Sequence, residues 1–176
     1  MSAPAALRLR HARASDVPSV KRLVDVYAGS GRRMLAKELH TLYETVQEFT
    51  VVVREDRAPP DEHVVGCGAL HVLWGDLGEV RTLAVDPAWR GREIGAAILD
   101  RLVERARDLE LSRLFALTFQ TAFFGRHGFV EIEGTPVDAA AFDALRRSWD
   151  PGVAEFLGLE YAKPNTLGNT RMLLEL

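Results

Sequence analysis

The stretch that decides the fold reads Leu83-Ala84-Val85-Asp86-Pro87-Ala88-Trp89-Arg90-Gly91-Arg92-Glu93-Ile94-Gly95. A strand ends at Asp86-Pro87, because proline cannot continue a strand ladder. A turn rich in arginine and glycine follows, and a long amphipathic helix begins at Ile94, whose first N–H groups have no partner within the helix. With the helix dipole, these amides form an anion site that Arg90 and Arg92 would strengthen. The stretch therefore predicts a phosphate-binding turn; a solvated turn that only starts a helix is the alternative.

The elements around this turn predict an α/β fold with a mixed sheet and helices on both faces. Strands are expected at 7–12, 49–53, 64–73, 79–85, 113–118, from 129 and at 170–176, and helices after 15 and at 35–47, 94–109, 121–127 and 139–147. The strand–helix–strand order around the helix 94–109 favours a parallel crossover. Gly66 and Gly68 indicate a bulge or a close backbone approach within their strand.

Composition limits the class of protein. The chain has 176 residues, of which 47% are hydrophobic and 27% charged, which predicts a single domain over 1–176. The net charge of -3 gives no reason to expect nucleic acid. One cysteine, Cys67, and the lack of a long apolar run predict a cytoplasmic protein without a membrane partner. The histidines show no metal-ligand spacing, so no metal is expected.

The turn resembles the acetyl-coenzyme A motif of the GNAT acetyltransferase superfamily, Arg/Gln-x-x-Gly-x-Gly/Ala. Arg90 matches its first position and Gly95 its last, whereas Glu93 stands where the family usually has glycine. The order of elements fits this superfamily over nearly the whole chain, which implies a sheet that splays into a V-shaped cleft. The resemblance implies acetyl-CoA (or CoA) as co-substrate.

The same resemblance assigns the cofactor contacts. It gives the pyrophosphate to main-chain amides of Arg90, Gly91, Arg92, Glu93, Ile94, Gly95 and Ala96. It gives the pantetheine arm and the acetyl carbonyl to the strand edge formed by Leu83, Ala84 and Val85, and Phe124 packs in the core or against pantetheine.

Three further segments, 70–85, 117–129 and 165–172, resemble the amino-acid N-acetyltransferases known as N-acetylglutamate synthases, in particular their short single-domain form from actinobacteria. This implies transfer of an acetyl group to the α-amino group of L-glutamate or L-glutamine, the first step of arginine biosynthesis, by direct attack in a ternary complex. Two other functions stay open: a GNAT enzyme that acetylates another amine, and a non-catalytic acetyl-CoA-binding module.

The resemblance also implies roles for individual side chains. Glu79 matches the usual base position, although a strand carboxylate can equally be solvated or paired, and the main-chain N–H near Leu83 is the oxyanion donor. Many members of the family use a tyrosine to protonate the leaving thiolate, but the matching region here has Phe123 and Phe124. Thr118, Thr121 or water would substitute for it, or the thiolate would leave without a dedicated acid. The candidates for contacts with the substrate carboxylates are Lys37, Arg81, Thr170 and Arg171. The segment 138–147 could form a homodimer interface, although an ordinary surface helix is the simpler explanation.

Overall fold

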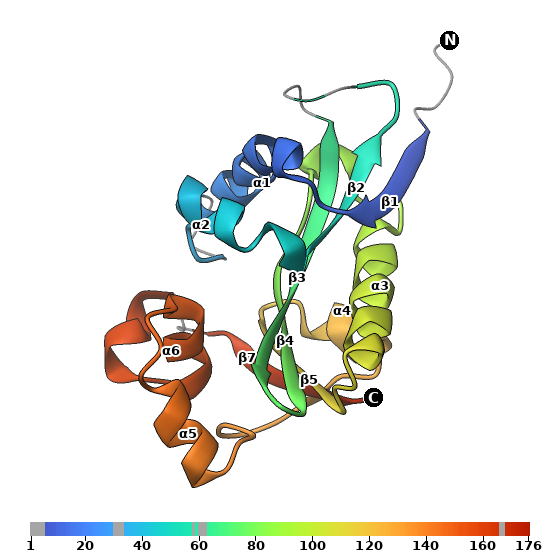
Figure 1. The fold of residues 1–176 in the computed structure, drawn as a ribbon. Helices are drawn as coiled ribbons and strands as arrows, with labels where there is room; N and C mark the ends of the chain where they lie inside the picture. The colour runs from blue at the N-terminus through green and yellow to red at the C-terminus, as the bar shows by residue number, and fades with distance from the viewer. Residues whose placement is uncertain (1–5, 30–33, 58, 60–62, 166–167) are drawn as a thin grey trace. The chain divides into compact units, whose positions relative to one another are not determined.

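The computed structural model describes residues 6–29, 34–57, 59, 63–165 and 168–176 (Figure 1). The elements are, in order, β1 (Leu7–His11), η1 (Ala14–Asp16), α1 (Val17–Gly29), α2 (Leu39–Glu44), η2 (Val46–Glu48), β2 (Phe49–Arg54), β3 (Val64–Trp74), β4 (Leu77–Val85), η3 (Pro87–Trp89), α3 (Ile94–Asp108), β5 (Arg113–Thr118), α4 (Thr121–Arg126), β6 (Val130–Glu131), α5 (Ala139–Leu145), α6 (Pro151–Leu157), η4 (Glu160–Asn165) and β7 (Thr170–Glu175).

The strands form one seven-stranded sheet in the order β1-β2-β3-β4-β5-β7-β6. Strands β4 and β5 are parallel, with Leu77 opposite Arg113 and Glu79 opposite Phe115. Their connection contains α3, so the predicted crossover is confirmed. The pairs β1/β2, β2/β3, β5/β7 and β6/β7 are antiparallel. The sheet is therefore mixed, as predicted.

The chain divides into two compact units, residues 1–70 with 81–105, and residues 71–80 with 106–176. In the first unit, α1 and α2 lie on one side of β2 and β3, and α3 lies on the other side (Figure 1). Apolar residues of α1, α2, β2, β3 and β4 form a buried core on the α1 side: Val17, Val20, Leu23, Val24, Leu42, Phe49, Val51, Val53, Val64, Cys67, Ala69 and Ala84.

Glycines in β3 allow α3 to pack closely on its face of the sheet. A Cβ atom at Gly66 would lie 2.6 Å from Ile94 Cγ2, and one at Gly68 would lie 2.7 Å from Ile98 Cγ2. Neither distance is compatible with a side chain, so the predicted close backbone approach is confirmed. The beginning of α3 is thus fixed against β3, which positions the turn that precedes it.

The second unit has its own core around β5. Phe115 of β5 and Phe156 of α6 meet edge to face, with ring centroids 4.9 Å apart, and Leu73, Leu77, Val153 and Leu157 are buried around them. The sequence prediction missed α6. Its signals are local: the Asp150 carboxylate accepts hydrogen bonds from the N–H groups of Gly152 and Val153, and Gly158 ends the helix at φ 67°. With only seven residues, the helix shows too little apolar periodicity to be detected.

The predicted second helix at 35–47 is wrong in extent. Regular helix covers only Leu39–Glu44, followed by the 3₁₀ turn Val46–Glu48. Within the predicted range, Leu39 is 43% exposed, whereas Leu42 is buried. Lys37, predicted to lie on this helix, precedes it in irregular backbone. Regular helix thus begins four residues later than predicted, at Leu39.

Candidate functional site

The turn between β4 and α3 has a defined backbone. The Asp86 carboxylate accepts a hydrogen bond from Ala88 N–H at 3.0 Å and so begins the 3₁₀ turn Pro87–Trp89. Gly91 follows with φ 75° and Glu93 with φ 56°, both in the left-handed region, and α3 begins at Ile94. Glycine adopts this conformation freely, whereas for glutamate it costs about 1–2 kcal/mol. The position where the family usually has glycine is therefore a strained one here.

This turn fits a diphosphate. Residues 90–93 are exposed, and a Cβ atom at Gly91 would meet nothing within 4 Å, so an anion can approach the main chain there. The fifteen residues of α3 direct the positive end of their dipole at the turn. The Arg92 guanidinium lies 4.7 Å from the centroid of the Trp89 ring, which holds that cation beside the turn. Glu93 is exposed, so its carboxylate can turn towards solvent.

Strand β4 contains a second strained residue, Thr82, with φ 55°. A β-branched residue in the left-handed region is rare, and such strain gathers at functional sites. The Cys67 thiol donates a hydrogen bond to the Thr82 carbonyl at 3.5 Å, and Leu83, the predicted oxyanion donor, follows directly. No sequence signal reveals Thr82, because threonine normally favours extended strand.

Cys67 itself is not a nucleophile. It is 0% exposed, and burial raises the pKa of its thiol to about 12. The thiolate is therefore not populated near neutral pH. Cys67 is therefore a small buried residue of the core.

Glu79, the predicted base, is buried in β4 at 6% exposure. In the same unit lies Arg171 of β7, whose pKa is lowered by burial, while the charges of Glu79 and Glu155 act in the opposite direction. Glu79 thus lies within electrostatic range of a half-buried cation. The role of Glu79 as the base stays a prediction.

The structure brings Thr118 and Thr170 together, because they are opposite each other in the antiparallel pair β5/β7, next to Leu117 and Arg171. The Thr118 hydroxyl accepts a hydrogen bond from Gln120 N–H at 2.9 Å, at the start of α4. Their functional roles remain predictions.

Arg171 has a clear structural role. It donates to the carbonyl oxygens of Phe156 at 2.7 Å, Glu155 at 3.2 Å and Gly134 at 3.3 Å. The first two carbonyls belong to the last turn of α6, where a cation is favourable. Arg171 therefore holds α6 to β7, and its substrate contact stays a prediction.

The remaining predicted residues lie in different parts of the fold. Lys37 and Arg81 are half-buried in the first unit, the latter in β4. Phe124 of α4, in the second unit, is buried between Phe123 and Phe129, with ring centroids 5.3 and 5.1 Å away. Phe124 therefore packs in the core of this unit, and its predicted contact with pantetheine stays a prediction.

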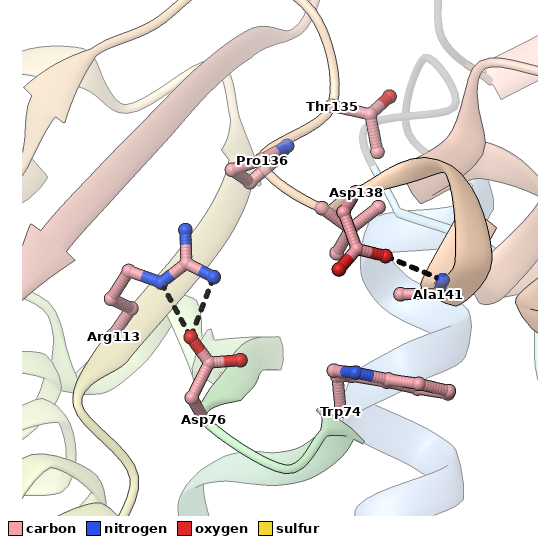
Figure 2. A pocket seen from close by; sticks show the side chains of 8 residues that line it. Trp74, Asp76, Arg113, Thr135, Pro136, Asp138 and Ala141 are labelled. Atoms are coloured by element: carbon pink, nitrogen blue, oxygen red, sulfur yellow. Dashed lines mark hydrogen bonds and ion pairs between the residues drawn. The ribbon is translucent and has the colours of Figure 1, made fainter.

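A separate pocket of about 460 Å³ lies in the second unit (Figure 2). It is lined by Trp74, Asp76, Arg113, Thr135, Pro136, Val137, Asp138 and Ala141. Arg113 donates twice to Asp76 Oδ2, at 3.0 and 2.7 Å, and Asp138 accepts from Ala141 N–H at 2.8 Å. No predicted site residue lines this pocket.

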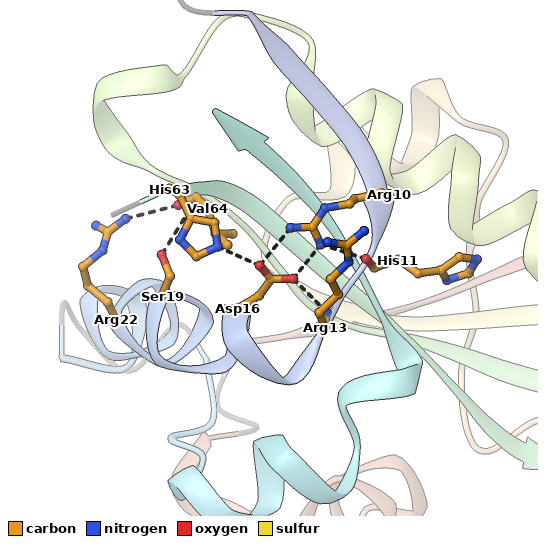
Figure 3. A network of polar contacts seen from close by, with 8 residues as sticks. All are labelled: Arg10, His11, Arg13, Asp16, Ser19, Arg22, His63 and Val64. Carbon is orange, nitrogen blue, oxygen red and sulfur yellow. Dashed lines mark hydrogen bonds and ion pairs between the residues drawn. The ribbon is translucent and has the colours of Figure 1, made fainter. Parts of the chain in front are cut away.

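A buried polar network joins β1, η1 and the residue before β3 (Figure 3). The Asp16 carboxylate, 0% exposed, accepts hydrogen bonds from Arg10 at 2.6 and 2.9 Å, from His63 at 2.6 Å and from Arg13 N–H at 2.7 Å. Burial alone would raise the pKa of Asp16, but these hydrogen bonds outweigh it and lower the pKa to about 2. The network stabilises the first unit and lies outside the predicted site.

The residues that the structure describes include neither a membrane span nor a metal centre. They contain no helix long and apolar enough to cross a bilayer. Within the same residues, no three side chains of His, Cys, Asp or Glu are grouped to hold a metal ion.

The comparisons with known proteins agree with this geometry. The model of the Acetyltransferase (GNAT) family matches residues 21–129. An amino-acid acetyltransferase from Mycobacterium tuberculosis is 63% identical over 168 residues, which cover 96% of this chain and 94% of that protein. The crystal structure of Rv2747 from Mycobacterium tuberculosis, in complex with CoA and NLQ, is 62% identical with a TM-score of 0.87 and covers 96% of this chain and 99% of that one.

A more distant structure shares the fold. N-acetylglutamate synthase from Neisseria gonorrhoeae, complexed with coenzyme A and N-acetyl-glutamate, is 22% identical with a TM-score of 0.72 and covers 99% of this chain and 36% of that one. The fold and the turn define an acyltransferase that uses a diphosphate-containing donor. The chain belongs to the GNAT acetyltransferase family. The predicted family, its fold and acetyl-CoA as co-substrate are thereby confirmed.

Proposed function

We propose that the chain, as one N-acetyltransferase domain, transfers the acetyl group of acetyl-CoA to the α-amino group of L-glutamate or L-glutamine. The observation that carries this proposal is the 63% identity, over nearly the whole of both chains, to the amino-acid acetyltransferase of Mycobacterium tuberculosis. The reaction would be the first step of arginine biosynthesis and would take place in the cytoplasm.

The reaction forms a bond between the α-amino nitrogen and the acetyl carbonyl carbon and breaks the C–S bond of the thioester. Because an ammonium has no lone pair, the buried Glu79 carboxylate first accepts a proton from it, directly or through water. The main-chain N–H of Leu83 donates a hydrogen bond to the carbonyl oxygen as negative charge develops there. After attack the nitrogen carries an excess proton, which it releases as the C–S bond breaks, and Thr118 or a water molecule relays a proton to the departing sulfur.

The backbone of β4 supports the assignment of the oxyanion donor. Thr82 in the left-handed conformation interrupts the regular strand immediately before Leu83. Such an interruption re-aims the next peptide group, as a bulge does. A fixed main-chain donor needs no reorganisation during the reaction, which makes it an effective stabiliser of developing charge.

Cations and hydroxyl groups would bind the substrate carboxylates. The candidates are Lys37, Arg81, Thr170 and Arg171. Arg171 uses three hydrogen bonds on main-chain carbonyls, which leaves two of its five N–H groups for a carboxylate.

The test is the release of free thiol from acetyl-CoA in the presence of a panel of amines: glutamate, glutamine, other amino acids and putrescine. We expect turnover with glutamate or glutamine. Turnover only with other amines would place the chain elsewhere in the GNAT family, and CoA binding without any turnover would indicate a non-catalytic module. Mass spectrometry of the product would establish acetylation at the α-amino nitrogen.

A further inference from the structure

We propose that Tyr27 of α1 is a positioning residue for the cofactor: it fixes the end of β4 and the side chain of Arg90 so that the turn is preformed for a diphosphate. The Tyr27 hydroxyl donates a hydrogen bond to the Val85 carbonyl at 2.5 Å and accepts one from Arg90 Nη2 at 3.0 Å. A single oxygen therefore joins the last residue of the strand to the first residue of the predicted pyrophosphate segment. The inference rests on the proposed use of this turn.

Tyr27 holds Arg90 by its ring as well as by its hydroxyl. The guanidinium carbon lies 5.7 Å from the centroid of the Tyr27 ring, within the range of a cation–π contact. Arg90 is exposed, and an exposed arginine otherwise samples many rotamers and loses that freedom on binding an anion. One of its five N–H groups bonds Tyr27, so the others can reach a phosphate. Preorganisation of this kind lowers the entropy cost of binding.

A second contact from α1 supports the same turn. Arg22 Nη1 donates to Asp86 Oδ2 at 3.1 Å. Arg22 Nη2 donates to the Val64 carbonyl at 3.2 Å, as Figure 3 shows. The other oxygen of Asp86 accepts from Ala88 N–H and starts the 3₁₀ turn. Helix α1 thus contacts the turn through Arg22 and Tyr27, five residues apart. Of these two residues, Arg22 supports the backbone of the turn through Asp86. Tyr27 also orients the guanidinium of Arg90 for the ligand.

The variant Tyr27→Phe tests the proposal, because it keeps the ring and removes only the hydroxyl. We expect the Kd of CoA, measured by calorimetry, to rise about five- to tenfold, as for loss of one charge-assisted hydrogen bond. The KM of acetyl-CoA should rise in parallel, while kcat and the KM of the amino acid stay unchanged. Tyr43→Phe on α2, where Tyr43 is 44% exposed, is the matched control and should leave the Kd unchanged.

A double variant separates positioning from general stability. If Tyr27 acts through Arg90, then Tyr27→Phe weakens CoA binding less in an Arg90→Ala background than in the wild-type chain, because no guanidinium remains there for the Tyr27 hydroxyl to orient. An unchanged Kd in Tyr27→Phe, or fully multiplied effects in the double variant, would overturn the proposal. Calorimetry with CoA needs no amino-acid turnover, so failure of the proposed substrate would be seen separately.

Discussion

Glu93 provides the sharpest prediction about the turn, because it combines a strained backbone with a negative charge at an anion site. Glu93→Gly removes both. Relief of the left-handed strain contributes about 1–2 kcal/mol, and the greater freedom of glycine in the unfolded chain opposes it by roughly 0.5–1 kcal/mol. The net gain in the free energy of unfolding is therefore about 0.5 kcal/mol, or a rise in Tm of about 1–2 °C for a chain of this size.

The negative charge of Glu93 affects the affinity for CoA rather than the stability of the fold. A unit charge roughly 7 Å from another costs about 0.6 kcal/mol in water, and a diphosphate carries about two charges, so the carboxylate weakens binding by about 1 kcal/mol before screening by salt. Glu93→Gln removes the charge and keeps the strain. We expect both variants to bind CoA about two- to fivefold more tightly, and only Glu93→Gly to gain stability.

Calorimetric titration with CoA and thermal unfolding measure the two effects separately. Glu110 is a matched control, because it is exposed and left-handed at φ 58° but follows the other end of α3. Glu110→Gly should raise Tm by a similar amount and leave the Kd of CoA unchanged. If Glu93→Gln leaves the Kd unchanged at low salt, or if Glu110→Gly tightens binding equally, the turn does not hold the diphosphate.

Three further predictions concern other residues. Glu79→Gln should lower kcat by about 10²–10⁴-fold with little change in the Kd of CoA, with Glu131→Gln as an exposed control; a wild-type rate across pH would show that Glu79 is not the base. Lys37→Ala should raise the KM of the amino acid about tenfold and not that of acetyl-CoA, and an unchanged value removes Lys37 from the site. The pKa of Asp16 falls from 3.8 to about 2 on folding, so its ionised form contributes about 2 kcal/mol above pH 4 that is lost as the pH falls towards 2. Urea unfolding of Asp16→Asn should therefore show a deficit that shrinks between pH 5 and pH 2, whereas a constant deficit would contradict the depressed pKa.

The sequence predicted those parts of the fold that depend on local patterns. The strand Arg113–Thr118 was placed with its bounds, and α3 to within one residue, because their apolar spacing is regular and their ends carry clear breakers. The close approach at Gly66 was also foreseen, since a glycine inside a strand needs a reason. Helix α6 was missed, although its Asp-Pro start and glycine end were present, because seven residues show little periodicity.

Other features could not be predicted because they depend on residues far apart in the chain. In the sequence, Tyr27 is spaced to lie on the apolar face of its helix, yet the two residues that it hydrogen-bonds lie 58 and 63 positions away. The left-handed backbone of Thr82 contradicts the preference of threonine, so only the three-dimensional environment can explain it. Glu93 was recognised as a departure from the motif, but its conformation required the structure.

Neighbouring contacts hold Thr82 of β4 and Glu93 of the turn in their strained backbone conformations. Thr82 and Glu93 each occupy a conformation that costs about 1–3 kcal/mol, and such conformations persist only where neighbouring contacts determine them. At Thr82 the buried Cys67 thiol bonds the carbonyl; between Thr82 and Glu93, Tyr27 bonds the carbonyl of Val85 and α3 packs against the β3 glycines. These contacts hold the main chain of β4 and the turn in place before any ligand arrives. A site built from main-chain N–H groups depends on such support, because its donors cannot adjust by rotating a side chain.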